Sequence, residues 1–235
     1  MTNTNFSSFH PPRSASRRAN VVLISLILFV LAITGYVTYR LINVKEGEAV
    51  DTKPVATTEV RQANLDDPKP TQDDISTWIV PDDHPRFISI DTIGMGKTRV
   101  ESVGRNANNQ IDIPHNIWNA AWFDESALPG VAGAGLYDCH TFFGIGYGLC
   151  NNLVNLKNGD KIVVERGDGI KYVYSTVEVK DLSLDEANAY VETLLKVPTG
   201  YGATQSISII TCTGNFDMNT QSADRRLTVR AILVG

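Results

Sequence analysis

Hydrophobic and polar residues divide the chain into three stretches. Between Val21 and Tyr39 no residue is charged, and this run is long enough to cross a bilayer core about 30 Å thick at about 1.5 Å per residue. Residues 43–76 are polar and rich in Pro, Thr and acidic side chains. From about residue 78, short apolar runs alternate with Gly, Asn and Asp. This order predicts a membrane-spanning segment, a flexible linker and a folded domain.

Charges around the apolar run predict its orientation. Arg13, Arg17 and Arg18 precede it without an acidic residue, so the positive-inside bias places the N-terminus in the cytoplasm and the domain outside the cell. A cleaved signal peptide is the alternative, but the run exceeds the about 7–15 residues of a signal's apolar region, and no A-x-A-like site follows. We therefore expect a single-pass protein of the cell membrane. Its expected parts are a cytoplasmic tail (1–20), a transmembrane anchor (21–42), a linker (43–76) and an extracellular domain (77–235).

Within the domain, seven runs of β-branched and aromatic residues favour strands. The turn at residues 167–169 (Gly-Asp-Gly) is typical of a hairpin. Residues 184–196 instead follow helical spacing, with Ser183 as N-cap and Glu186 as its capping-box partner. The pattern predicts a mainly β domain, closed or sandwiched, with one clear helix. The expected strands cover residues 86–90, 96–103, 133–139, 161–167, 170–182, 206–212 and 226–234.

Composition narrows the range of functions. The net charge of −5 gives no reason to expect a nucleic-acid partner, since phosphate binding needs a basic face. No His, Cys and Asp residues have metal-ligand spacing, so neither a metal nor another cofactor is expected. The chain has three cysteines. Outside the cytoplasm two of them can pair, which leaves one free thiol.

Cys212 is the first candidate for chemistry. It ends an apolar run and is followed at once by Thr213, Gly214 and Asn215. A strand that stops at a cysteine and opens into such a loop presents the thiol at a rim, where a nucleophile has both support and access. A buried structural cysteine is the alternative, because free cysteine is among the most buried residue types.

Two basic residues are candidates to assist the thiol. His140 directly follows the predicted strand 133–139 and can act as a general acid or base, or else is an ordinary loop histidine. Arg226 opens the last predicted strand. An antiparallel return from Cys212 would bring its guanidinium beside the thiol, where it can hold an oxyanion. Arg225 would face the opposite side of the pleat, and a solvated edge arginine is the alternative for Arg226.

Together these residues resemble the sortase family. The resemblance lies in the run SISIITCTG, the later run RLTVRA and a histidine at the end of an earlier strand, and it covers nearly all of residues 78–235. The loop ITCTGNFD (210–217) is especially similar to class F, with class E as the alternative. The resemblance implies a closed, eight-stranded β-barrel with one or more short helices, and a membrane-anchored cysteine transpeptidase without a cofactor.

The resemblance also implies a reaction and its partners. Sortases cut a C-terminal sorting signal of the Leu-Pro-x-Thr-Gly type between Thr and Gly, through a thioacyl enzyme. They pass the acyl group to an amine of a cell-wall precursor or a pilin lysine. Carried over, Cys212 attacks the threonyl carbonyl, His140 protonates the leaving amine, and Arg226 supports the oxyanion. The segment 183–204 would shape the Leu-Pro pocket. Residues expected to contact the signal are Thr211, Thr213 and Arg225.

The sequence departs from the family pattern in two places. Cys139 stands where many relatives have Gly before the histidine, and a disulfide between Cys139 and Cys150 would pin the following loop and leave Cys212 free. Two free thiols, or a Cys139–Cys212 bond in an inactive or redox-controlled state, are the alternatives. The adjacent Arg225 and Arg226 leave the choice of the assisting arginine open. If these departures abolish catalysis, the chain is an inactive sortase homologue. The alternative function outside the family is that of an anchored extracytoplasmic β-domain that acts as a binding module.

Overall fold

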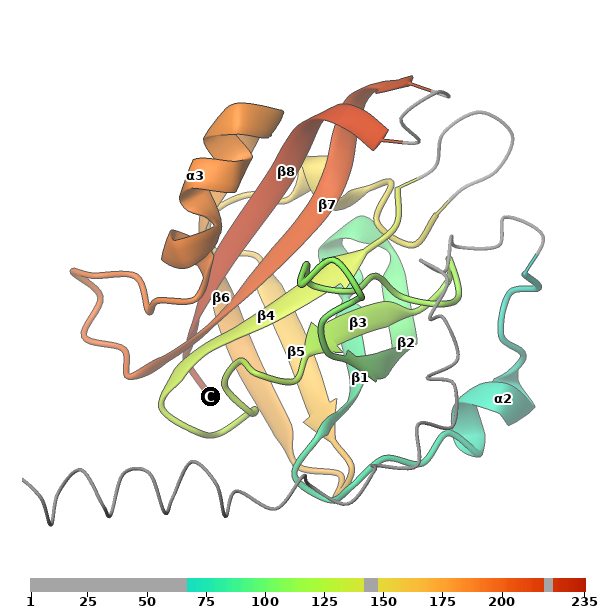
Figure 1. The fold of residues 1–235 in the computed structure, drawn as a ribbon. Coiled ribbons are helices and arrows are strands. Elements are labelled where there is room, and N and C mark those ends of the chain that lie inside the picture. Colours follow the sequence, from blue (N-terminus) through green and yellow to red (C-terminus); the bar gives the residue numbers. More distant parts are fainter. Residues whose placement is uncertain (1–66, 142–147, 218–221) are drawn as a thin grey trace, which may run out of the picture. The chain divides into compact units, whose positions relative to one another are not determined.

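The described part of the chain forms a closed β-barrel. The computed structural model describes residues 67–141, 148–217 and 222–235, which all fall in the second of two units, Thr58–Gly235. Eight strands close in the order β1-β2-β3-β4-β7-β8-β6-β5 (Figure 1). The prediction of a mainly β, closed, eight-stranded fold is therefore confirmed. The predicted tail and anchor lie outside the described residues, among which no helix is long and apolar enough to cross a membrane.

The strands and helices have the following bounds. The strands are β1 (Pro85–Ile90), β2 (Met95–Val103), β3 (Ala120–Phe123), β4 (Gly133–Cys139), β5 (Lys161–Arg166), β6 (Lys171–Ser183), β7 (Gln205–Asp217) and β8 (Ser222–Leu233). The helices are α2 (Gln72–Ser76) and α3 (Leu184–Leu194), with short 3-10 turns η1 (Asp91–Ile93) and η2 (Leu153–Asn155).

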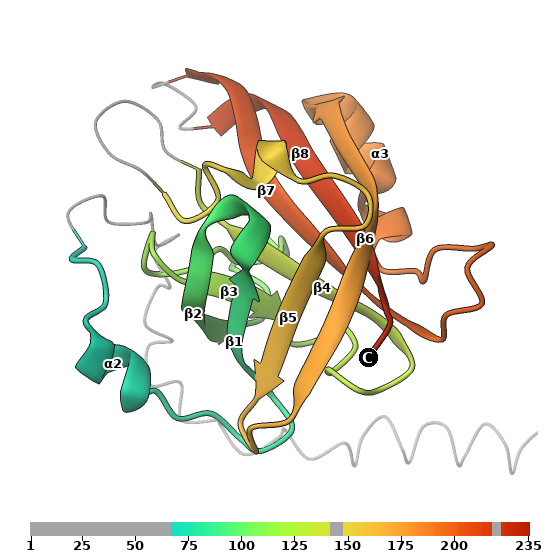
Figure 2. The same ribbon diagram turned by 180° about the vertical axis from the view of Figure 1, so that it is seen from behind.

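Two parallel pairs distinguish this barrel from a simple meander. β2 pairs in parallel with β3, and β4 pairs in parallel with β7, whereas the other neighbours are antiparallel. Because β4 and β7 run the same way, their C-terminal ends lie at the same end of the barrel. Figure 2 shows the opposite wall, where β5 and β6 form the hairpin that the Gly-Asp-Gly turn predicts.

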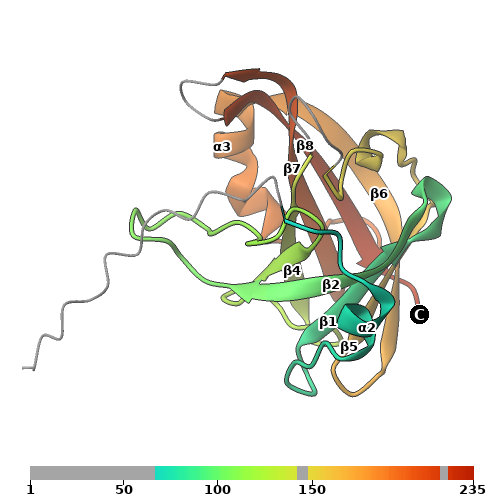
Figure 3. The same ribbon diagram turned by 90° about the vertical axis from the view of Figure 1, so that its right-hand side faces the viewer.

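Helix α3 packs on the outside of the barrel against β6, β7 and β8 (Figure 3). Ser183 caps it in a capping box with Glu186, as the sequence predicts. Hydrogen bonds then fix its C-terminal end: Ser208 donates to the Leu194 carbonyl at 2.8 Å, and Arg230 donates to the Lys196 carbonyl at 2.7 Å. The helix is thus held over the outer face of β7 and β8.

The sequence-based assignment of strands is wrong in three places. The short strand β3 is absent from the sequence-based assignment, and β7 does not stop at Cys212 but continues to Asp217, paired with the start of β8. Strand β8 begins at Ser222, so Arg226 is its fifth residue and does not open it.

Residues 72–76, at the end of the predicted linker, form α2. Thr71 and Asp74 close a capping box at its start. The Trp118 indole donates to the Asp67 carbonyl at 3.2 Å, so this segment is held against the domain.

Candidate active site

Side chains of β4, β7 and β8 alternate between the barrel interior and an outer face. Cys139 and Ile209 lie in the central hydrophobic core, whereas Leu136 and Ile210 belong to a second cluster that includes Leu194 of α3. Cys212 lies two residues after Ile210, and His140 lies four residues after Leu136, so in each pair the two side chains point to the same side of the sheet. Both therefore belong to the outer face, on the side of the barrel that α3 covers.

The register of β7 with its two neighbours brings the candidate residues together. Cys212 is the direct partner of Arg226 on β8. On the other side, Asp138 of β4 is level with Ile210, so continuing this register by two residues brings His140 level with Cys212. The Thr141 hydroxyl donates to the Cys212 carbonyl at 2.6 Å and ties the two segments together. The three residues predicted to be catalytic thus come from three adjacent segments.

Cys212 is a half-buried free thiol. Burial raises its pKa above the ordinary value, and the nearby Asp138 carboxylate raises it further. The Arg226 guanidinium and a hydrogen bond from the Ala223 backbone N–H act in the opposite direction, because both favour the thiolate. Burial is thus the main influence on the pKa of the thiol, and the Arg226 guanidinium and the Asp138 carboxylate adjust it in opposite directions.

His140 and Arg226 are both held by hydrogen bonds to backbone carbonyls. The His140 Nε2 atom lies 3.0 Å from the Pro114 carbonyl oxygen. Arg226 donates to the carbonyls of Ala223 and Arg225 at 2.9 Å each, and to the Ser222 hydroxyl at 3.0 Å. These contacts engage three of the five guanidinium N–H groups. The Arg226 head is thus fixed at the start of β8, next to the strand that carries Cys212.

Arg225 is engaged on the other side of β8. Its Nε donates to Asp181 of β6 at 3.0 Å, and its Nη2 donates to the Asp181 carbonyl at 3.0 Å. Arg226, not Arg225, is in register with Cys212. Between the two adjacent arginines, the geometry therefore favours Arg226 as the one that assists the thiol.

A pocket of about 360 Å³ lies on the same outer face. β3, β4 and β7 contribute Ala121, Leu136 and Ile210, and α3 contributes Val191 and Leu194. Figures 1 and 3 show α3 and the β2–β3 connection on the same side of the barrel, flanking β4. The pocket is mainly apolar, with a few polar groups. Its other lining residues are Val103, Arg105, Gln110, Ile111, Phe123, Tyr137, Asp138, Asn188 and Leu195.

Comparison with known proteins identifies the family. Residues 88–234 match the sortase domain. The chain belongs to the sortase family. This confirms the predicted family. The match does not distinguish classes, so class F and class E remain predictions.

Solved sortase structures resemble the chain at low identity. Sortase A from Corynebacterium diphtheriae is 22% identical over 63% of this chain and 60% of its own, with a TM-score of 0.45. Sortase C-1 from Streptococcus pneumoniae is 20% identical over 67% and 70%, with a TM-score of 0.46. An SrtA sortase from Actinomyces oris is 17% identical over 64% and 79%, with a TM-score of 0.45.

The extent of these matches is partial. The chain covers 63% and 60% of two of the solved sortases, sortase C1 of the GBS pilus island 1 and the Corynebacterium enzyme. A search of curated proteins found no match. The family assignment rests on the domain match.

Two threonines predicted to contact the signal have different positions in this sortase. Thr211 is only 1% exposed, and its hydroxyl donates to the Cys139 carbonyl at 2.5 Å. It points inward because it alternates with Cys212, so it braces β7 against β4 and does not line the pocket. Thr213 is half-buried, in register with Arg225 at the end of the regular β7–β8 pairing. Its contact with a signal remains a prediction.

The sortase contains a disulfide between Cys139 and Cys150, with Cα atoms 5.8 Å apart. Both cysteines are buried. The Cys150 N–H also donates to the His140 carbonyl at 2.9 Å. The bridge therefore closes the loop that leaves the site at His140, and it leaves Cys212 as the free thiol.

Loss of this disulfide is expected to destabilise the domain. The bridge spans a sequence separation of 11, and closing a loop of that size contributes about 2–3 kcal/mol to the free energy of unfolding. The double variant Cys139→Ala/Cys150→Ala should therefore melt about 5–10 °C lower than the wild type. Thermal unfolding of both proteins without reductant measures this difference. Cys212→Ser is the matched control, and an equal drop in that variant would contradict the assignment.

Sequence reasoning missed Asp138. This residue lies two positions before His140 on β4, and therefore on the same outer face. Burial raises its pKa to about 6, although the positive charges of His140 and Arg226 act to lower it. The sequence contained an indication of this residue, because Asp138 is the only charged residue in the predicted strand 133–139.

Removing the Asp138 charge is expected to make Cys212 more reactive. At pH 8 Asp138 is ionised and disfavours the thiolate, so Asp138→Asn should speed alkylation of Cys212 by iodoacetamide roughly 2- to 5-fold. The ratio of the two rates should fall toward 1 below about pH 6, where Asp138 is itself neutral. Arg226→Gln should slow alkylation. If Asp138→Asn slowed it as well, the electrostatic account would be wrong.

Proposed function

We propose that this sortase is a membrane-anchored, extracellular transpeptidase that cleaves Leu-Pro-x-Thr-Gly-like sorting signals between Thr and Gly. One observation carries the proposal: the free thiol of the chain, Cys212, shares one outer barrel face with His140 and Arg226, next to a mainly apolar pocket. A nucleophile, an acid–base group and a fixed cation beside a substrate-sized pocket are the parts that acyl transfer requires.

In the proposed reaction, the Cys212 sulfur attacks the threonyl carbonyl and passes its proton to His140. The tetrahedral oxyanion is stabilised by the Arg226 guanidinium, which is already fixed in place. Collapse of this intermediate breaks the Thr–Gly bond, and His140 returns the proton to the leaving amine. An incoming amine then attacks the thioacyl carbon, loses its proton to His140 and releases Cys212.

The pocket supports an apolar signal. Val191, Leu194 and Leu195 of the α3 segment face it together with Leu136 and Ile210 from the barrel wall. Such a surface suits the Leu and Pro side chains of the proposed motif, because burying them removes apolar area from water. The α3 segment lies within residues 183–204, which the family resemblance assigns to the Leu-Pro pocket.

Three finer parts of the proposal come from the sequence. The uncharged run 21–39 supports a retained anchor with the N-terminus in the cytoplasm. The loop ITCTGNFD supports class F over class E. The acceptor is proposed to be an amine of a cell-wall precursor or a pilin lysine, because family members use such amines.

A covalent intermediate tests the proposal directly. The full-length chain in detergent is mixed with a peptide that contains Leu-Pro-x-Thr-Gly, and the reaction is quenched in acid. Intact-mass spectrometry should show the enzyme plus the acyl fragment that ends in Thr, and peptide mapping should place the adduct on Cys212. Hydroxylamine should then release the fragment as a hydroxamate. An adduct elsewhere, or none with any signal variant, would reject the proposed function and favour a binding module or an inactive homologue.

A further inference from the structure

Asp138 is the one acidic side chain among the described residues that line the pocket. Its partners across the sheet are Ala121 on β3 and Ile210 on β7, and both are apolar. Leu194 and Leu195 of the α3 segment line the same pocket. A carboxylate is therefore presented within a mainly apolar surface.

Within the described part of the chain, no basic side chain forms an ion pair with Asp138 at 4.0 Å or less. The Asp138 carboxylate accepts a hydrogen bond from the Cys139 backbone N–H, but a carboxylate has about four acceptor positions. The raised pKa, about 6, shows that burial outweighs the stabilisation from Cys139, His140 and Arg226. The carboxylate thus retains capacity for a further donor.

The pocket's own cation is engaged elsewhere. Arg105 is the basic residue of the lining, but its Nε is paired with Glu125 at 3.0 Å, and its guanidinium lies over the Phe123 ring at 5.1 Å from the centroid. The described lining therefore offers Asp138 no free cation. Since the pocket is the proposed binding surface for the sorting signal, the signal is the natural source of such a cation.

We propose that Asp138 selects sorting signals that carry a Lys or Arg side chain at the position before the scissile threonine, which is the variable position of the Leu-Pro-x-Thr-Gly motif. This inference rests on the proposed function and specifies its substrate class. The ammonium or guanidinium group would form a charge-assisted hydrogen bond with Asp138. The methylene stem would lie along the apolar walls, as long cationic side chains do at apolar surfaces.

The strand register shows how far Asp138 lies from a peptide side chain bound at Cys212. Asp138 is level with Ile210, which lies two residues before Cys212 on β7. Two residues of strand span about 7 Å. In an extended peptide whose threonyl carbonyl lies at Cys212, the residue before Thr lies about 3 Å further along the strand direction, and its Lys side chain can span the remaining distance to the carboxylate.

Matched peptides test this selection on the full-length chain in detergent. The two peptides carry Lys or norleucine at the position before Thr and are otherwise identical, with the Leu and Pro of the motif kept. Norleucine keeps the apolar stem and lacks the ammonium. In the wild type, kcat/KM for the Lys peptide should exceed that for the norleucine peptide about 10-fold, which corresponds to about 1.4 kcal/mol. The measured quantity in every protein is this Lys:norleucine ratio.

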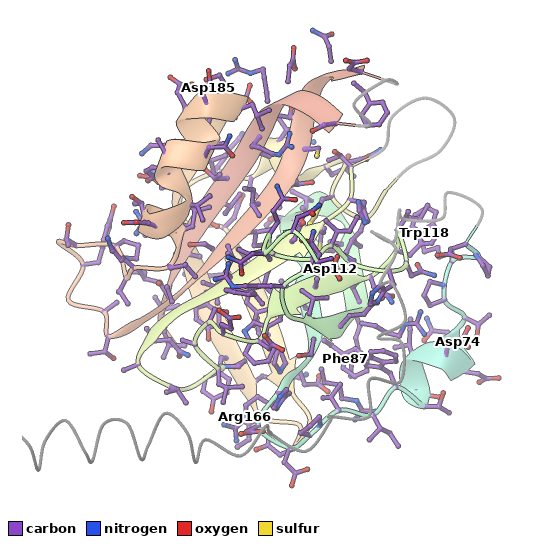
Figure 4. The ribbon with its side chains drawn as sticks, in the orientation of Figure 1. Asp74, Phe87, Asp112, Trp118, Arg166 and Asp185 are labelled. Atoms are coloured by element: carbon purple, nitrogen blue, oxygen red, sulfur yellow. A yellow bond between two sulfur atoms is a disulfide. The ribbon has the colours of Figure 1, made fainter. Side chains whose placement is uncertain are left out.

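Three variants separate charge recognition from general damage. Asp138→Asn should bring the ratio to about 1 whatever its absolute rate, and Asp138→Glu should restore part of the preference because it restores the charge. Asp112→Asn is the control: Asp112 lies in the β2–β3 connection (Figure 4), outside the pocket lining, so the ratio should stay as in the wild type.

The outcomes distinguish this inference from the proposed function. Cleavage without a Lys preference in the wild type, or with a preference that Asp138→Asn retains, overturns the role of Asp138 and leaves the transpeptidase intact. If no peptide in the set is cleaved through Cys212, the proposed function and the inference both fail.

Discussion

Cys212→Ala is expected to lower turnover of a sorting-signal peptide about 10⁴-fold or more. The thiol is the only nucleophile of the proposed mechanism, and removing a covalent nucleophile has effects of this order in other acyl-transfer enzymes. Release of the fluorescent fragment from a quenched peptide measures the rate for the full-length protein. The thioacyl adduct should disappear in the same variant.

The fold should survive this substitution. Cys212 is half-buried and takes no part in the disulfide, so the variant should melt within about 2 °C of the wild type. Equal turnover by Cys212→Ala and wild type would show that another group performs the cleavage. Loss of turnover together with loss of the fold would instead make Cys212 a structural residue.

Arg226→Ala is expected to lower kcat about 10²- to 10³-fold, which is the usual effect of removing one oxyanion donor. Arg226→Lys should recover only part of this loss, because an ammonium lacks the planar fork. The peptide assay at saturating substrate measures kcat. Chemical alkylation of Cys212 shows whether the thiol is still accessible in each variant.

Arg225→Ala is the matched comparison for Arg226. The two residues are adjacent and have the same chemistry, but the Arg225 guanidinium is held by Asp181 on β6. We expect a loss of less than about tenfold in kcat for this variant, chiefly from the broken surface ion pair. If Arg225→Ala is the more damaging substitution, the roles of the two arginines are reversed.

Local patterns predict most of the barrel. The alternation of apolar and polar positions located seven strands, and the capping signals of Ser183 and Glu186 located α3. Strand β3 was not predicted for two reasons. All four of its residues are buried, so the sequence shows no alternation there. Two of the four are alanines, which have low strand propensity. Helix α2 was not predicted because it has only five residues, and Ile75 is the only apolar one.

The candidate site depends more on pairing between distant strands. The sequence analysis predicted that a strand returning antiparallel after Cys212 would bring Arg226 beside it. The register of β7 and β8 pairs these two residues directly. The place of His140 depends on the parallel pairing of β4 with β7, which joins residues about 70 positions apart. Asp138 carries a charge that the sequence displays, but its neighbours in the pocket come from β3, β7 and α3.

The alternation of side chains along β4 and β7 also separates the free thiol from the disulfide. Cys139 and Cys212 are on neighbouring strands, yet the first faces the core in its disulfide and the second faces outward as a free thiol. Thiolate attack on a disulfide requires direct access to one of its sulfur atoms. The barrel wall lies between the Cys212 thiol and the disulfide, so the thiol lacks that access. The protein can therefore contain both a free thiol on β7 and a structural disulfide on the neighbouring strand β4. A slip of β7 by a single residue would turn Cys212 inward and invite exchange.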